Sequence, residues 1–129
     1  GTVNQQTAVV DSPATTAWQM RPTAVEAAVA SPLMLKLGTI VCAANSLVTV
    51  TARMRRDNTG LTMRLACPGG QISGVATDVT SNLTAAANTW DTVTITFTPT
   101  KAGGVDIYAY AFGGTTFSGY VSNLTASQA

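Results

Sequence analysis

Hydrophobic and polar residues alternate one by one in several separate segments of this chain. The clearest segment is Thr92 to Thr98, in which Val93, Ile95 and Phe97 fall on one side and threonines on the other. Strict alternation is typical of a β-strand with one buried face and one solvated face. Pro99 cannot donate a hydrogen bond to a sheet, so we expect this strand to end there.

The same pattern predicts strands along most of the chain. Their expected ranges are Thr15 to Met20, Leu33 to Cys42, Leu47 to Arg55, Leu61 to Cys67, Val105 to Ala111 and a last strand around Tyr120 to Leu124, with one more short strand inside Ile72 to Asn88. Ala24 to Ala30 is flanked by prolines, and we expect a strand or irregular structure there. About eight short strands with turn residues between them predict an all-β protein, a two-sheet antiparallel sandwich of the jelly-roll type.

Period-two patterning also predicts which side chains form the core between the two sheets. The expected core residues are Val50, Met54, Met63, Leu65, Val93, Ile95, Phe97 and Leu124. For the polar segment Gly1 to Pro13 we expect an arm or a loosely attached first strand, followed by a single domain over residues 14–129. Arms of this kind often lie on a neighbouring molecule.

The turn signal Asp57 to Gly60 predicts a hairpin that carries a cluster of positive charge. Its arginines are Arg53, Arg55, Arg56 and Arg64. On such a hairpin Arg56 lies at the turn and the other three share the outer face. One interpretation is a solvated face that protects exposed strands from pairing with other chains. The other is a docking patch for an acidic partner surface, since arginine pairs well with carboxylates.

The strand predicted from Val105 onward places its aromatic residues on one face. Tyr108, Tyr110 and Phe112 alternate with Ile107, Ala109 and Ala111. Aromatic rings on a sheet surface bind sugar rings in many proteins, so these three residues are a candidate carbohydrate site. The alternative interpretation is that the rings fill the core and the alanines face outward. For Trp18 and Trp90 we expect packing in the core or at its rim.

Composition narrows the range of functions. Charged residues make up 10% of the 129 residues and the net charge is +1, which disfavours nucleic-acid binding. Histidine is absent, which removes the commonest general base and metal ligand. The six carboxylates are scattered singly, so no catalytic residues are predicted and we expect the protein not to be an enzyme and to need no cofactor.

The remaining features concern the setting of the chain. No apolar stretch approaches the roughly 20 residues of a membrane helix, so we expect no membrane insertion. The chain begins at Gly1, which predicts a processed product or a part of a longer polypeptide. Cys42 and Cys67 each end an apolar strand, and we expect buried single thiols, with a disulfide as the alternative.

Several segments resemble the carbohydrate-binding jelly rolls of secreted cellulases and xylanases, and the related jelly-roll modules of phage virion proteins. The similar segments are Leu47 to Arg55, Trp90 to Pro99, the turn Ala102-Gly103 and the end Tyr120 to Leu124. The sugar-binding relatives usually carry two acidic residues in the last strand, one of which helps to bind structural calcium. Ser122 and Asn123 occupy these positions here, so the comparison predicts no metal site.

These observations favour a structural or adhesive module on a larger assembly. The resemblance implies a bacteriophage virion, in which the chain would be a capsid decoration or tail-associated protein. Its expected partners are capsid or tail proteins, with a homo-oligomer as a further possibility, and its expected location is the virion surface or the extracellular space. The alternative is a carbohydrate-binding module of a secreted enzyme or adhesin, with a glycan as its ligand.

Overall fold

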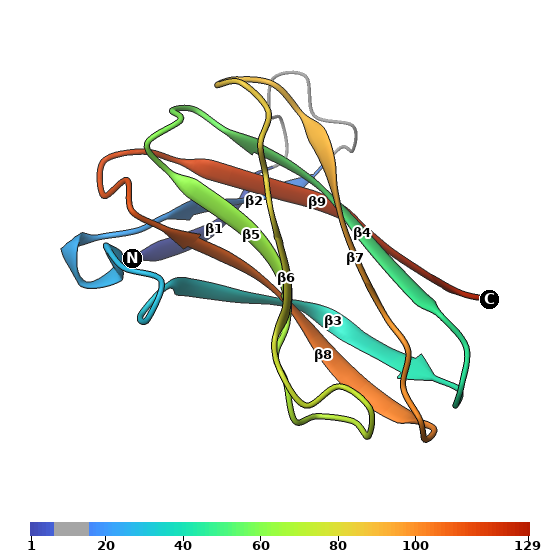
Figure 1. The fold of residues 1–129 in the computed structure, drawn as a ribbon. Coiled ribbons are helices and arrows are strands. Elements are labelled where there is room, and N and C mark those ends of the chain that lie inside the picture. Colours follow the sequence, from blue (N-terminus) through green and yellow to red (C-terminus); the bar gives the residue numbers. More distant parts are fainter. Residues whose placement is uncertain (7–15) are drawn as a thin grey trace.

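The computed structural model describes residues 1–6 and 16–129, which form two packed antiparallel sheets (Figure 1). The strands are β1 (Thr2–Gln6), β2 (Ala17–Arg21), β3 (Leu33–Cys42), β4 (Val48–Arg56), β5 (Thr62–Cys67), β6 (Val79–Asn82), β7 (Asp91–Phe97), β8 (Gly103–Phe112) and β9 (Gly119–Gln128). One sheet has the order β1-β2-β9-β4-β7 and the other β3-β8-β5-β6. The predicted two-sheet antiparallel sandwich is confirmed, and its assignment to the jelly-roll type stays a prediction.

Alternation along the strands explains the core. In β7 the side chains of Val93, Ile95 and Phe97 are buried and the intervening threonines are exposed. In β4 the same parity buries Val50 and Met54. Of the eight predicted core residues, all are buried except Leu124, which is partly buried and packs against the cluster.

The segment between β2 and β3 is irregular, as one of the two alternatives for it predicts. It contains only a short 3-10 helix, η1 (Ala24–Glu26), whose start is capped by Thr23 and Glu26. Among the residues that the structure describes, no helix is long and apolar enough to cross a membrane.

The predicted hairpin between β4 and β5 does not exist. These two strands belong to different sheets, so Asp57 to Gly60 is an arch that crosses the sandwich. The sequence signal was misleading because a tight turn and a crossing arch use the same turn residues. Of all consecutive strands in the described part of the chain, only β1 with β2 and β5 with β6 are hydrogen-bonded neighbours.

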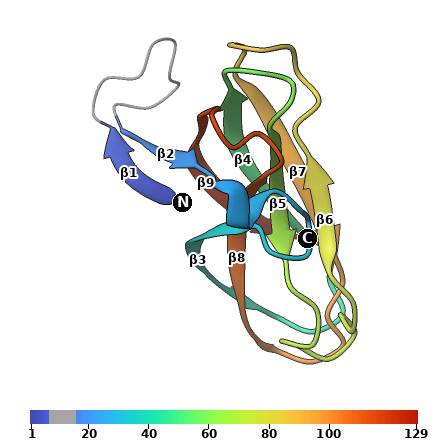
Figure 2. The ribbon, with the colours of Figure 1, turned by 90° about the vertical axis from the view of Figure 1, so that its left-hand side faces the viewer.

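The N-terminal segment is tied to the five-stranded sheet where it is described. β1 pairs with β2 from Thr2↔Arg21 to Gln6↔Ala17 and forms the outer edge of that sheet (Figure 2). The amino group of Gly1 lies 2.9 Å from the carboxylate of Glu26. The first strand expected here is therefore present over Thr2–Gln6, and residues 7–13 of the predicted arm lie outside the described residues.

Candidate functional site

The four predicted docking arginines lie in three different places. Arg53 and Arg55 alternate with buried residues of β4 and lie on the outer face of the five-stranded sheet. Arg53 Nη1 donates to Thr92 Oγ1 at 3.0 Å, and Arg55 Nη2 donates to Asn88 Oδ1 at 3.0 Å. Both guanidinium groups are thus oriented along the sheet surface.

Arg56 has a structural role. It lies at the end of β4, where its guanidinium group donates to the carbonyl oxygen of Ala85 at 3.0 and 3.3 Å and to that of Leu61 at 3.1 Å. These bonds join the arch after β4 to the loop before β7. Arg56 therefore satisfies loop carbonyls rather than adding to a docking patch.

Arg64 lies on the opposite side of the sandwich. It belongs to β5, where its guanidinium carbon is 5.1 Å from the centre of the Phe112 ring and its Nε donates to Asn82 Oδ1 at 2.7 Å. The single face predicted for Arg53, Arg55 and Arg64 is wrong, because β4 and β5 are in different sheets.

Two aromatic residues join Arg53 and Arg55 on what we call the arginine face. Tyr120 of β9 stands opposite Arg55, whose guanidinium carbon is 5.6 Å from the Tyr120 ring centre. The ring centres of Trp90 and Tyr120 are 6.5 Å apart at an interplanar angle of 51°. Gln19 Nε2 donates to the Tyr120 hydroxyl at 3.2 Å. The arginine face comprises Gln19, Arg53, Arg55, Trp90 and Tyr120.

The sequence pattern does not indicate that these five residues lie together, because the pairing of β9 with both β2 and β4 brings them side by side. The signal that could have found Tyr120 is its place next to Val121 in a strand that alternates, which predicts an outward side chain.

The aromatic residues of β8 face outward, so the interpretation that they fill the core is wrong. Ile107, Ala109 and Ala111 are fully buried, and Tyr108 and Tyr110 are partly exposed on the outer face of the four-stranded sheet. Their ring centres are 6.2 Å apart at an interplanar angle of 44°. We call the surface around these two rings the tyrosine face.

The other members of the tyrosine face include charged and apolar groups. Met34 stands opposite Tyr110 and is 49% exposed. Lys36 stands opposite Tyr108, and its amine lies 3.3 Å from the carboxylate of Asp106. The hydroxyl of Thr39 and the amine of Lys36 lower the pKa of Asp106, whereas burial raises the pKa of Tyr110. Phe112 is buried and is not a free platform.

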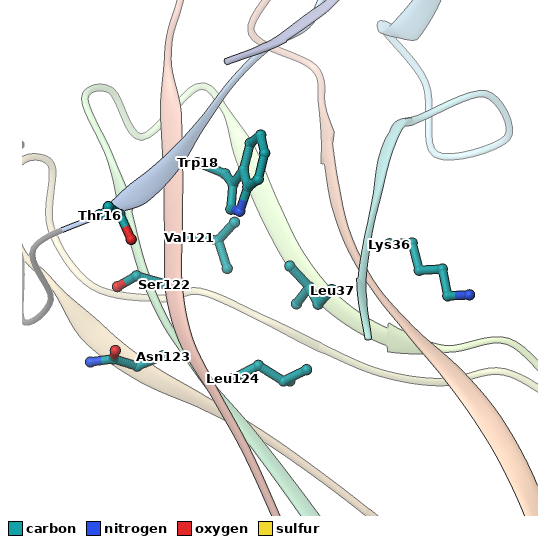
Figure 3. A pocket seen from close by; sticks show the side chains of 8 residues that line it. All are labelled: Thr16, Trp18, Lys36, Leu37, Val121, Ser122, Asn123 and Leu124. Atoms are coloured by element: carbon teal, nitrogen blue, oxygen red, sulfur yellow. The ribbon is translucent and has the colours of Figure 1, made fainter. Parts of the chain in front are cut away.

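A pocket of about 320 Å³ opens at the side of the sandwich where β3 ends its sheet (Figure 3). Trp18, Val121, Leu37 and Leu124 line it from three strands. Ser122 and Asn123 of β9 also border it, with side chains that point away from the Trp18 indole. We call it the edge pocket. Trp18 is 39% exposed there, so of the two places expected for it, the core and its rim, it lies at the rim.

The structure describes two buried cysteines, Cys42 and Cys67, that are not joined, as one of the two alternatives predicts. Burial raises the pKa of the Cys67 thiol to about 11. In the described parts of the chain, no three His, Cys, Asp or Glu side chains are grouped as a metal site would require.

The described carboxylates serve the fold. Oxygens of Asp57, Asp78 and Asp91 accept backbone N–H bonds from Ser118, Gly69 and Thr92 respectively. Glu26 accepts from the backbone of Thr23 and pairs with the N-terminal amine. Asp106 accepts a hydrogen bond from Thr39 Oγ1 at 2.7 Å.

Comparison with known proteins gives a fold relationship. No protein-family model and no curated protein sequence matches this chain. Among solved structures, it is similar to part of the enzymatically active domain of tailspike protein 4 from bacteriophage CBA120, with a TM-score of 0.69 and 15% sequence identity. The match covers 99% of this chain and 18% of the tailspike chain. The likeness therefore concerns the two-sheet β-sandwich fold, and this chain spans less than a fifth of the length of the chain that it matches.

Proposed function

We propose that this chain is a structural or adhesive module of a bacteriophage virion, associated with the tail, without catalytic activity of its own. The observation that carries the proposal is the likeness to a tailspike over nearly the whole chain. The use of the described carboxylates in local hydrogen bonds supports a role in binding rather than catalysis.

The arginine face is the surface we assign to assembly contacts. Tryptophan, tyrosine and arginine contribute most to binding energy in protein interfaces, and on this face Tyr120 contacts both Trp90 and Arg55. Arginine side chains that are already held by Thr92 and Asn88 lose less conformational entropy when a partner binds. An acidic protein surface in the virion would complement Arg53 and Arg55.

Location on the particle is tested by immunogold electron microscopy. Phage particles are purified from lysates of a host that carries the gene, and an antibody against this chain is applied to them. We expect gold at the tail. Labelling of the capsid would replace the tail assignment with a decoration role, and absence of the chain from purified particles would contradict the proposal.

The contact surface is tested by the docking of purified chain on particles that lack it. Arg53→Glu should weaken docking by about 2 kcal/mol or more, because reversing a charge at a desolvated contact is costly. Lys101→Glu makes the same charge change in the exposed turn before β8 and is the matched control. Equal effects of the two substitutions would show that only net charge matters.

Carbohydrate binding at the tyrosine face is the second candidate function. The observation in its favour is the outward orientation of Tyr108 and Tyr110, whose rings lie 6.2 Å apart on a sheet surface. Exposed aromatic rings of this kind can stack on the apolar faces of sugars. Tyr108→Ala or Tyr110→Ala would then abolish retention on a polysaccharide in affinity electrophoresis, while Arg53→Glu would leave it unchanged.

A further inference from the structure

The side of β7 that faces away from β4, which we call the β7 edge, is a free edge of the five-stranded sheet. β7 is the last strand in the order β1-β2-β9-β4-β7, and Figure 2 shows it on the opposite side of the sandwich from β1. In an edge strand, alternate N–H and C=O groups point away from the one neighbour that it has. Within the described part of the chain, no backbone hydrogen bond outside the β4 pairing involves Thr92 to Phe97. These groups are therefore available to another strand.

The other edge strands carry features that hinder pairing with a foreign strand. β1 has five residues and β6 has four, so each offers few backbone groups. β3 is longer, but it contains the exposed Lys36, and its register with β8 shifts between Lys36 and Gly38. Shortness, lysine and bulges are the usual means by which proteins protect the edges of their sheets.

β7 has none of these protective features. Its seven residues keep an unbroken register with β4 from Met54↔Asp91 to Val48↔Phe97. The residues after Asp91 include no charge and no proline, and all are types with high β-propensity. Arg53 is bonded to a threonine of β7, but it belongs to β4, one strand in from the edge. β7 is thus the edge strand best suited to accept another strand.

The sequence of β7 is complementary to a second copy of itself. Antiparallel pairing over all seven residues about a two-fold axis sets Thr94 opposite the partner's Thr94 and Thr92 opposite the partner's Thr96. On the inner face, Val93 then lies opposite the partner's Ile95. The one charged residue of β7 is at its first position, so no two like charges face each other in this register. Threonine pairs and β-branched pairs are favourable in antiparallel sheets.

The outer face of the sheet already contains a block of threonines that such pairing would extend. Thr51 of β4 stands between Thr94 of β7 and Thr125 of β9, and the hydroxyls of Thr51 and Thr125 are hydrogen-bonded. Thr49 stands opposite Thr96 in the same way. A second copy of β7 would place its own three threonines beside this block. The surface next to the β7 edge is therefore matched to β7 itself.

We propose that two copies of this chain associate through their β7 edges, with the two β7 strands antiparallel. The pairing joins two five-stranded sheets into one sheet of ten strands. Closed two-fold dimers are the commonest assemblies of identical chains. The paired strands gain main-chain hydrogen bonds but little apolar burial, because Val93 and Ile95 are each only 3% exposed in the single chain. Association is therefore reversible and depends on concentration.

The dimer presents both arginine faces on the same side of the joined sheet. Arg53 and Arg55 lie on the outer face, and a two-fold axis that pairs the edges keeps that face continuous. Two linked faces bind an extended acidic surface more tightly than one, since the second contact is intramolecular. This consequence rests on the proposed docking function, whereas the pairing of the strands does not.

Sedimentation equilibrium of the purified chain tests the association. We expect the mean mass to rise toward that of two chains as the concentration increases. Thr94→Lys should weaken the dimer more than about tenfold, because it sets two lysines opposite each other at the centre of the pair. Thr94 is exposed, so the melting temperature of the dilute chain should change little. A chain that stays monomeric at every concentration would overturn the inference.

Thr125→Lys is the matched control. It makes the same change at an exposed position of the same outer face, but in β9 rather than at the β7 edge. It should leave the association unchanged. Equal weakening by both lysines, or weakening by Thr125→Lys alone, would show that the β7 edge is not the contact.

Cysteine cross-linking tests the register of the pair. Thr94→Cys should form a disulfide-linked dimer on mild oxidation, because the two introduced thiols stand opposite each other with Cβ atoms about 5 Å apart. Thr92→Cys faces the partner's Thr96 and should cross-link much less. Cys42 and Cys67 are buried and should not compete. Equal cross-linking at both positions would contradict the proposed pairing, and particle labelling tests the virion role independently of these results.

Discussion

At the scale of single residues, Asn123 determines how β9 meets its neighbours. Before the bulge Val121 faces the core opposite Met54, and after it Ala126 stands opposite Val50 on the same side of the sheet, where it is exposed. These two residues of β9 are five positions apart in the sequence, so without the extra residue of the bulge their side chains would lie on opposite faces. The left-handed backbone at Asn123 thus keeps both halves of β9 paired with β4 while changing which residues share the face of Val121.

Replacing Asn123 with alanine should lower the free energy of unfolding by about 1 kcal/mol, because alanine tolerates the left-handed region poorly. Asn123→Gly should stay within about 0.5 kcal/mol of the parent, since glycine adopts this conformation freely. Urea denaturation of both variants measures the difference. Equal losses would show that the side chain, rather than the backbone conformation, is needed.

The Cys67 thiol makes the stability of the fold depend on pH in the alkaline range. Burial raises the pKa of this thiol from 9.0 to about 11, so the folded chain keeps this proton where the unfolded chain has lost it. The stability that this difference in pKa provides is fully present below pH 9 and is lost as pH rises toward 11. Cys67→Ala should therefore flatten the fall in melting temperature over this range. Some slope should remain, because burial also raises the pKa values of Cys42 and Tyr110.

At the scale of elements, the strands differ in what each face contributes. In β7 one face supplies the core and the other a row of exposed threonines. The arch from β4 to β5 instead depends on a side chain, because Arg56 holds the carbonyls of two loops. Burial stabilises the strands, and charge-assisted hydrogen bonds stabilise the connections.

Adjacent residues of β7 should respond very differently to truncation. Ile95→Ala should cost about 2 to 5 kcal/mol, because it removes buried apolar volume. Thr94→Ala, its exposed neighbour, should stay within about 0.5 kcal/mol. Chemical denaturation of the pair checks the inward and outward assignment, and similar costs would contradict it.

Replacement of Arg56 and replacement of Arg53 should also have different effects on the stability of the fold. Arg56→Ala should destabilise the fold by roughly 2 kcal/mol, since loop carbonyls lose charged donors. Arg53→Ala should cost under about 1 kcal/mol, because its bond to Thr92 is exposed. Thermal melts of both variants, compared at one pH, measure this contrast. A larger loss for Arg53 would mean that the arginine face is structural.

At the scale of the whole molecule, one hydrophobic cluster joins the two sheets. It draws on both sheets and includes residues from β2 to β9. A domain with one shared core usually unfolds in a single cooperative transition. Its stability should come from this core, without a bound ion.

Metal removal should accordingly leave the melting temperature unchanged. The resemblance to sugar-binding jelly rolls implied acids at Ser122 and Asn123, and these residues supply no charge for calcium. A melt in EDTA compared with one in excess calcium tests this expectation. A fall of several degrees in EDTA that calcium reverses would reveal a bound ion.

The surfaces were only partly predictable. Alternation correctly oriented Arg53 and Arg55, because the parity of one strand is a local property. It offered two orientations for Tyr108 and Tyr110, since aromatic residues suit either face and alanine is small enough for both. The edge pocket gave no signal at all, because Trp18, Leu37 and Leu124 are far apart in the chain and meet only across the sheets.

The sequence by itself determined the strands, most of the core and the sandwich class, because period-two alternation depends on neighbours along the chain. Tertiary structure alone decided which strands pair. It placed β4 and β5 in different sheets, which split the arginines, and it set β2 beside β9, which created the arginine face and the edge pocket. The physical reason is that strand pairing minimises the free energy of the whole chain. Turn residues are a local signal, and they do not specify which strands become neighbours in a sheet.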